Sequence, residues 1–265
     1  MTRKTAKVGG AITTYEYDAE NKLVRVVDSG TTVNYRYDGP GRRVEKEVVS
    51  ASTTVTRYIY DNEDILLELD GSNNITARYT HGPGIDEPLI MEKGGTSFFY
   101  HADGLGSITE ITNQSGGAVQ RYTYSSFGEI ESQVDSNFIQ PYTFTAREFD
   151  TETALYYYRA RTFDASVGRF LQQDPLGFAG GDLNLYSYLA NNPVVFTDPS
   201  GTIKVPGPLK RWACSYVATY CCYLDYSECL GKLDLKTCPP QDIEKCHAAY
   251  LACMAKAGKM ILDSQ

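Results

Sequence analysis

Aromatic or β-branched residues alternate with polar ones through most of the first 145 residues, as from Thr54 to Tyr60. A period of two residues is typical of a strand with one buried face. Groups of Gly, Asp, Asn, Ser and Pro separate these stretches, for example at residues 38–41, 70–73 and 115–117. The pattern predicts antiparallel β-structure from residue 12 to about 145, with no long helix.

A short motif, Tyr-x-Tyr-Asp, recurs along the predicted strands. Copies begin at Tyr15, Tyr35, Tyr58 and Tyr79, and weaker ones at Tyr100, Tyr122 and Tyr142, so the starts are 20 to 23 residues apart. This period indicates a repeat architecture, in which hairpins stack because each is too small to bury its own apolar face. Most of these tyrosines are therefore expected to pack in the core. The alternative is a β-rich binding module that uses them as a contact surface.

Two changes of composition divide the chain into three expected parts: a β array (1–144), a closing segment (145–202) and a tail (203–265). The closing segment is rich in turn residues and contains two Asp-Pro pairs, at Asp174 and Asp198. All seven cysteines lie between Cys214 and Cys253 in the tail. Residues 1–202 hold 17 Lys/Arg and 27 Asp/Glu, against 8 and 6 in the tail. The net charge of −8 argues against a nucleic-acid-binding surface on the core.

The repeats and the closing segment resemble the YD repeats and the end of the core of Rhs (rearrangement hotspot) proteins. The resemblance extends from Thr145 to Gly201 and includes Asp174-Pro175, Asn184-Leu185-Tyr186 and Asp198-Pro199-Ser200-Gly201. It implies a strand that spirals into a hollow shell around a variable, toxic C-terminal domain. About seven repeats are too few to close such a shell. We therefore expect the last part of an Rhs protein, a mainly β partial shell with a closing plug.

Asp174 and Asp198 are the candidate catalytic residues. Two carboxyls held together do not both ionise readily, so one can take a proton from water while the other polarises a peptide carbonyl. The resemblance implies that this pair cuts the chain shortly after Gly201, between Thr202 and Ile203. Asp-Pro is also a common way to open a turn, and sequence alone does not bring the two carboxyls together.

The closing segment departs from the family pattern at three places. Gln173 stands where an Arg often precedes the first Asp-Pro, Thr202 replaces a usual Leu, and one extra residue lies between the aspartates. Asp182, beside that insertion, is interpreted as a turn residue. The family pattern also includes Arg147 and Arg169, which we expect to form salt bridges inside the plug.

The chain offers little other chemistry. It has three histidines, and His81 and His101 occupy repeat positions usually held by Tyr or Asp. No phosphate-binding loop or Gly-x-Ser-x-Gly elbow is present, so no cofactor is expected. Seven cysteines and His247 could bind zinc in the tail, but the tail lacks a Cys-x-x-Cys pair and the cysteine spacings do not suit a compact tetrahedral site, so no metal is expected.

The tail is expected to form a small helical hairpin held by disulfides. Its apolar residues recur at helical spacing, and Pro239–Pro240 would open the second helix. In an antiparallel helical hairpin, two residues that face each other across the helices have residue numbers whose sum is the same for every such pair. That condition pairs the cysteines as Cys214–Cys253, Cys221–Cys246 and Cys229–Cys238 and leaves Cys222 over. Cys222 lies only slightly outside the face that the other cysteines share, so Cys222 in place of Cys221 is the alternative pairing. Such a density of disulfides implies an oxidising compartment. The alternative is seven reduced cysteines in a helical core.

The family position makes the tail a secreted effector of unknown target, released by self-cleavage. Its expected partners are an upstream Rhs shell or secretion machinery and a cognate immunity protein. The chain opens without an apolar leader, and its longest apolar run, at 212–224, is too short to span a membrane. We therefore expect a secreted or cell-surface protein exported by a non-classical route. The alternative is a structural or adhesive surface fragment with an inert tail.

Overall fold

A computed structural model describes residues 2–8, 11–180, 182–202 and 205–206. The chain divides into two units, Met1–Gly207 and Pro208–Gln265, and the second lies outside the described residues. The expected helical hairpin, the three disulfides and Ile203 therefore also lie outside them.

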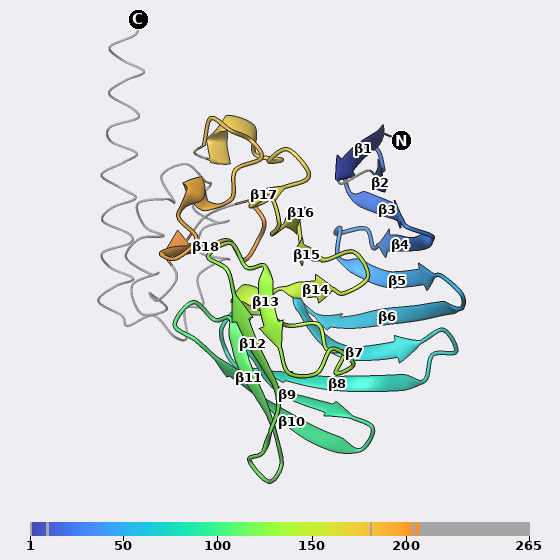
Figure 1. The fold of residues 1–265 in the computed structure, drawn as a ribbon, viewed down its shortest axis with the longest axis vertical. Helices are drawn as coiled ribbons and strands as arrows, with labels where there is room; N and C mark the ends of the chain where they lie inside the picture. Colours follow the sequence, from blue (N-terminus) through green and yellow to red (C-terminus); the bar gives the residue numbers. More distant parts are fainter. Residues whose placement is uncertain (1, 9–10, 181, 203–204, 207–265) are drawn as a thin grey trace, which may run out of the picture. The chain divides into compact units, whose positions relative to one another are not determined.

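One antiparallel sheet of 13 strands, here called the shell sheet, occupies residues 2–133, and its strands pair strictly in chain order (Figure 1). This confirms the predicted mainly β architecture. The strands are β1 (Thr2–Val8), β2 (Ala11–Tyr17), β3 (Leu23–Asp28), β4 (Thr31–Tyr37), β5 (Arg43–Val49), β6 (Thr53–Asp61), β7 (Asp64–Asp70), β8 (Ile75–His81), β9 (Pro88–Lys93), β10 (Thr96–Ala102), β11 (Ile108–Asn113), β12 (Ala118–Tyr124) and β13 (Ile130–Gln133).

An Asp or Asn at the end of a strand builds several of the turns, and in the first repeats this residue is the aspartate of the motif. The Asp18 carboxylate accepts hydrogen bonds from the backbone N–H groups of Glu20 (2.9 Å) and Lys22 (2.8 Å). Asn21 inside this turn has a φ of 63°, in the left-handed region where Asn and Gly are favoured. A β-bulge between Glu16 and Tyr17 accompanies the turn, and bulges bend and twist a sheet. The same acceptor pattern recurs at Asp70, Asp103 and Asn113.

The tyrosines of the motif form the core of the shell sheet, as predicted. One aromatic ring of each copy is buried, and these rings belong to Tyr17, Tyr35, Tyr58, Tyr79, Tyr100, Tyr122 and Tyr142. Tyr142 packs edge-on against Tyr79, with ring centroids 5.5 Å apart. Buried rings cannot serve as the contact surface of the alternative interpretation. The copy at Tyr142 differs from the others because it forms only an isolated bridge with Glu148 and not a strand of the shell sheet.

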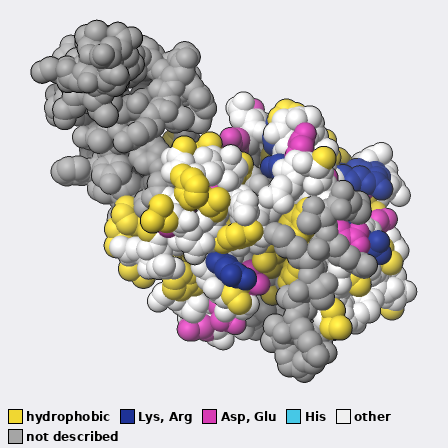
Figure 2. Space-filling model, turned by 90° about the horizontal axis from the view of Figure 1, so that it is seen from above, with side chains coloured by type: hydrophobic (Ala, Val, Ile, Leu, Met, Phe, Trp, Pro, Cys, Tyr) yellow, Lys and Arg dark blue, Asp and Glu magenta, His cyan; other side chains and the backbone are white. Residues whose placement is uncertain are grey.

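Charged side chains form cross-strand pairs on the shell sheet. Glu45 lies opposite Arg36 on one neighbouring strand and Arg57 on the other, with N–O distances of 3.0 and 2.8 Å. On the face drawn in Figure 2, acidic and basic side chains lie near one another among polar and apolar ones. Exposed pairs of this kind contribute little to stability, typically about 0–1 kcal/mol each.

The closing segment forms a second, smaller sheet with an aromatic core. Its rings Tyr156, Tyr158, Phe163, Phe170 and Tyr188 are fully buried. The elements in and beside it are η1 (Phe144–Ala146), β14 (Glu148–Asp150), β15 (Leu155–Tyr158), β16 (Arg161–Asp164), β17 (Arg169–Phe170), η2 (Gly177–Gly180), η3 (Leu189–Asn191) and β18 (Phe196–Thr197), and β18 pairs with β19 (Val205–Pro206). The order β14-β15-β16-β17 is again sequential.

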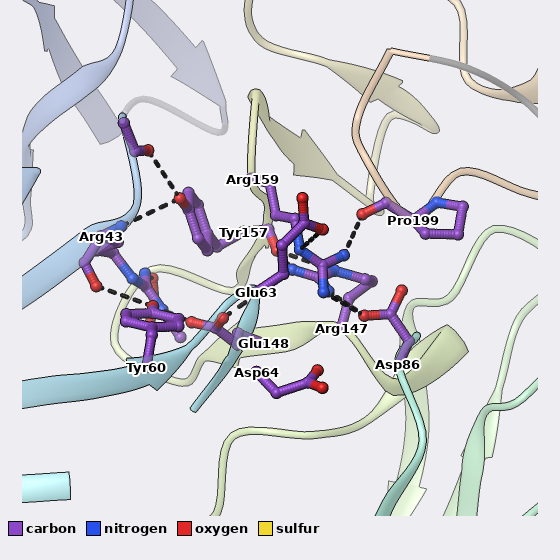
Figure 3. Close-up of polar contacts among 12 residues, drawn as sticks. Arg43, Tyr60, Glu63, Asp64, Asp86, Arg147, Glu148, Tyr157, Arg159 and Pro199 are labelled. Carbon is purple, nitrogen blue, oxygen red and sulfur yellow. Dashed lines mark hydrogen bonds and ion pairs between the residues drawn. The ribbon is translucent and has the colours of Figure 1, made fainter. Parts of the chain in front are cut away.

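Buried ion pairs join the closing segment to the shell sheet. Arg43 of β5 contacts Asp150 (2.5 Å) and Glu148 (2.8 Å) of β14, and the Arg43 side chain is 3% exposed. Its guanidinium also lies 4.7 Å from the ring centre of Tyr157 on β15, part of the group drawn in Figure 3. Lys46 contacts Asp150 at 3.1 Å. The carboxylates of β14 therefore have their counter-charges more than 100 residues earlier in the chain.

Burial alone would raise the pKa of Asp150, but Arg43 and Lys46 overcome this effect and hold it below its ordinary value. A carboxyl with a depressed folded pKa adds stability above its unfolded pKa, which is about 3.9 for Asp. That contribution is lost as the pH falls through the folded pKa. The ion pairs between shell sheet and closing segment are therefore fully effective from mildly acidic pH upward.

Replacing Arg43 should remove its ion pairs with β14 and lower the free energy of unfolding substantially. In Arg43→Met, two carboxylates remain buried without their main cation, so the free energy of unfolding should fall by about 3–5 kcal/mol. Arg36→Met, one strand away at an exposed pair, should cost no more than about 1 kcal/mol. Urea unfolding followed by circular dichroism measures both. Equal losses in the two variants would contradict the assigned role of Arg43.

Candidate functional site

The two predicted aspartates each open a turn, as their Asp-Pro sequences favour. Asp174 follows β17, and its carboxylate accepts the backbone N–H of Leu176 at 2.8 Å. Asp198 follows β18, and its Oδ1 accepts the backbone N–H of Thr202 at 3.0 Å. Asp198 is 3% exposed. These turns fix each carboxyl relative to its own neighbours in the sequence. They do not explain why the two carboxyls lie close together.

Arg161 brings the two carboxyls together. Its Nη2 lies 3.1 Å from Asp174 Oδ2 and 3.3 Å from Asp198 Oδ2. Because both contacts share one nitrogen, the two oxygens can be no further apart than the sum of these distances. The guanidinium carbon lies 3.6 Å from the centre of the Phe170 ring, and this cation–π contact helps to hold the guanidinium in place. Arg161 is on β16, so the sheet of the closing segment positions the group that joins the aspartates.

A small cavity opens beside this triad. It leaves about 20 Å³ for the centre of a water molecule, enough for one water. Asp174, Asp198, Arg161 and Thr202 line it together with Asp182. The candidate carboxyls, a guanidinium and the residue before the expected cleavage point thus share one polar space.

The environment of Asp174 shifts its pKa upward. Burial raises the pKa of Asp174, and this effect exceeds the opposing influence of the Leu176 N–H and of Arg161. Burial also lowers the pKa of Arg161, although both aspartates act in the other direction. Both oxygens of Asp198 likewise have donors, Arg161 on Oδ2 and two groups, Ser200 and Thr202, on Oδ1, where Asp174 has only the Leu176 N–H. A larger number of donors around a carboxyl favours its charged form.

Three consecutive residues of the β15–β16 turn hold the chain before the expected cut. Arg159 donates to the carbonyl of Pro199, the Ala160 N–H donates to the carbonyl of Ser200 at 3.2 Å, and Arg161 Nε donates to the carbonyl of Gly201. The backbone of residues 199–201 is therefore bonded at each carbonyl.

Gly201 has a structural reason to be glycine. Its φ is 73°, and a Cβ there would collide with the carbonyl oxygen of Tyr158. The close approach of the two backbones is what allows the β15–β16 turn to reach these carbonyls. The glycine of Asp-Pro-Ser-Gly is therefore required by the way the turn docks.

The remaining sequence-predicted residues lie around this centre. Arg147 is buried, pairs with Asp86 of the shell sheet and donates to the carbonyl of Tyr157. Arg169 is exposed at the start of β17, opposite Asp164 of β16. Asp182 accepts the backbone N–H of Asn184, as a turn residue does. Gln173 is exposed.

Sequence reasoning missed Arg159 and Arg161. Both stand in the stretch Tyr158-Arg159-Ala160-Arg161, which has no motif that distinguishes them from the other arginines. The family pattern often places an Arg before the first Asp-Pro, where Gln173 stands here. In the structure the cation at the carboxyl pair is Arg161, more than ten residues earlier in the chain.

Within the described residues, no group of three His, Cys, Asp or Glu side chains is placed to hold a metal ion. In the same part of the chain, no helix has the length and apolar character needed to cross a membrane.

The fold and the site define the chain as part of a YD/Rhs-repeat shell with its closing segment. A family model described as teneurin YD-shell matches residues 6–194, and the chain belongs to this family. The resemblance to Rhs proteins that the repeats carry is thereby confirmed.

Similar proteins include several toxins. The chain is 35% identical over 201 residues to the tRNA nuclease WapA of Bacillus subtilis (strain 168), which is 71% of this chain and 8% of WapA. It is 29% identical over 209 residues to the probable deoxyribonuclease RhsA of Dickeya dadantii (strain 3937), covering 72% of this chain and 14% of RhsA. The chain is therefore related to the Rhs/YD-shell polymorphic toxins, and it spans only a small part of these relatives.

Among solved structures, the Photorhabdus luminescens Tc holotoxin pore with a mutated TccC3 matches with a TM-score of 0.58. The identity is 22%, and the match covers 74% of this chain and 10% of that chain. At this identity the likeness shows the fold alone.

Proposed function

We propose that the closing segment cuts its own chain once, through Asp174 and Asp198, and so releases the tail as an effector. The observation that carries the proposal is the shared contact of both carboxyls with Arg161, in a cavity that Thr202 also lines. The membership in a family that includes toxins supports a releasable tail. The bond we propose is Thr202–Ile203.

In this mechanism, a water molecule attacks the carbonyl carbon of Thr202. Ionised Asp198 takes a proton from the water, and protonated Asp174 donates a hydrogen bond to the carbonyl oxygen. The tetrahedral intermediate then collapses, the carbon–nitrogen bond breaks, and Asp198 gives the proton that it took from water to the leaving amine of Ile203, which restores both carboxyls to their starting state. Arg161 orients both carboxyls and, through its bond to the Gly201 carbonyl, the backbone beside the reacting bond.

Wild-type protein with a C-terminal tag should separate into two fragments on a denaturing gel, and mass spectrometry should place the new N-terminus at Ile203. Asp174→Asn and Asp198→Asn should stay whole, because each removes one half of the acid–base pair. Asp182→Asn is the matched control, since this carboxyl lines the same cavity and caps a turn of its own but is not a member of the proposed acid–base pair. Wild-type protein that remains intact, or cleavage that survives both substitutions, contradicts the proposal.

The rate of cleavage should decrease as the pH rises. Asp174 acts in its protonated form, and its raised pKa extends that form above the range of an ordinary carboxyl. As the pH rises through this pKa the proton is lost and the rate falls. The protein is purified in denaturant, refolded between about pH 5 and about pH 8, and quenched at intervals; the ion pairs of Asp150 are intact over this range. A rate that increases toward pH 8 would assign the acid to another group.

We further propose that the tail contains the bridges Cys214–Cys253, Cys221–Cys246 and Cys229–Cys238 and acts in an oxidising compartment, reached by a non-classical route. An upstream shell or secretion machinery and an immunity protein are its proposed partners. Each bridge would stabilise the tail by about 3 kcal/mol in the chain-entropy model.

Mass mapping of the non-reduced full chain should find these three bridges and one alkylated thiol, Cys222. Seven alkylated thiols under oxidising conditions, or another pairing, would rule out the ladder. The competing function, an adhesive surface fragment, predicts that residues 203–265 are harmless when expressed in either the cytoplasm or the periplasm. Growth arrest in one of them is expected of an effector.

A further inference from the structure

We propose that Arg159 is a positioning residue that couples docking of the shell sheet to the geometry of the cleavage turn, residues 198–202. The inference rests on the proposed self-cleavage and concerns its control. It makes the carboxyl pair effective only when shell-sheet loops hold the closing segment in place. The contacts of a single side chain carry the argument.

Arg159 bonds to three separate parts of the molecule at once (Figure 3). Its Nε lies 3.0 Å from Glu63, in the turn between β6 and β7, and its Nη2 lies 2.8 Å from Asp86, in the loop between β8 and β9. Its Nη1 donates to the carbonyl of Pro199 in the cleavage turn. One guanidinium therefore connects two shell-sheet loops with the residue that follows Asp198.

The shell-sheet end of this connection is rigidly held without Arg159. Asp86 also pairs with Arg147, whose side chain is 2% exposed and whose guanidinium is fixed by the carbonyl of Tyr157. Loss of Arg159 would thus leave Asp86 paired with another cation. The main consequence of the loss falls on the cleavage turn and not on the buried charge of the shell sheet.

A cavity of about 250 Å³ lies under the cleavage turn, between it and the shell sheet. Arg159, Ala160, Ser200 and Thr202 line it on one side, and the shell-sheet residues that line it include Glu63. Because this space separates the turn from the shell-sheet residues that line the cavity, packing between those two surfaces does not fix the turn here; its close backbone contact is with the β15–β16 turn. Arg159 connects the two sides, since it contacts Glu63 and donates to the Pro199 carbonyl, and Lys22 from the turn between β2 and β3 donates to the Arg159 carbonyl at 3.1 Å.

The path from Arg159 to the carboxyl pair is short. Pro199 follows Asp198 directly, and Asp198 Oδ1 accepts the N–H of Thr202. A shift of the Pro199 carbonyl therefore moves both a member of the pair and the residue whose bond is cut. A misplacement of about 1 Å can lower a rate by about 100-fold.

The test measures cleavage of the full chain after refolding. Arg159→Gln and Glu63→Gln should both slow cleavage, the first by about 100-fold. In the double variant, Glu63→Gln should add nothing further, because its effect passes through Arg159. Glu152→Gln is the matched control: it breaks the Lys46–Glu152 pair between shell sheet and closing segment, also 3.0 Å long, without touching the turn. Cleavage of Arg159→Gln at the wild-type rate, or additive effects in the double variant, overturns the proposal.

A second measurement separates this inference from self-cleavage itself. In the intact Asp174→Asn background, hydrogen exchange of the Thr202 amide reports whether its bond to Asp198 is kept. Arg159→Gln and Glu63→Gln should accelerate that exchange about tenfold relative to the background, and Glu152→Gln should not. Unchanged exchange in Arg159→Gln overturns the positioning role. Accelerated exchange in this background, combined with wild-type protein that remains intact after refolding, supports positioning and contradicts self-cleavage.

Discussion

Buried charge must be paired, and in this protein the partners lie 61 to 107 positions apart in the chain. Asp150 and Glu148 can enter the interior because Arg43 meets them there, and Asp86 can because two arginines of the closing segment surround it. Removing one member of such a set leaves an uncompensated charge in a medium of low polarity. The pairing therefore fixes where the closing segment sits on the shell sheet, and the location of the carboxyl pair follows from it.

The shell sheet supplies these partners because one local rule is repeated many times. An Asp or Asn that caps the turn, a left-handed residue three positions later and a bulge recur in several hairpins, as at Asp18 and Asn21. The bend of these hairpins lets strands that are far apart in the sheet reach the closing segment. Arg43 of β5 and the carbonyl of Gly128, which accepts the Tyr156 hydroxyl, show this directly.

The parts that sequence could predict are those set by local pattern. Alternation and the Tyr-x-Tyr-Asp period predicted the strands and the buried tyrosines, and the Asp-Pro motif predicted two turns. Arg159 and Arg161 could not be recognised, because their partners Asp86 and Asp198 lie 73 and 37 positions away and many arginines offer the same charge. The repeat at Tyr142 was mispredicted as a strand because Thr145 and Ala146, just beyond it, adopt left-handed conformations that the pattern does not report.

The contact of both carboxyls with Arg161 opposes the protonation of one carboxyl that the proposed mechanism requires. A guanidinium between two carboxyls favours the ionised form of both, whereas an acid–base pair needs one proton to remain. Burial of Asp174 outweighs the nearby cation and raises its pKa, while Asp198 accepts bonds on both oxygens. The two carboxyls are thus made unequal by their surroundings although they share one partner. In the proposed mechanism Arg161 positions both carboxyls, and the raised pKa of Asp174 together with the additional donors around Asp198 distinguishes the acid from the base.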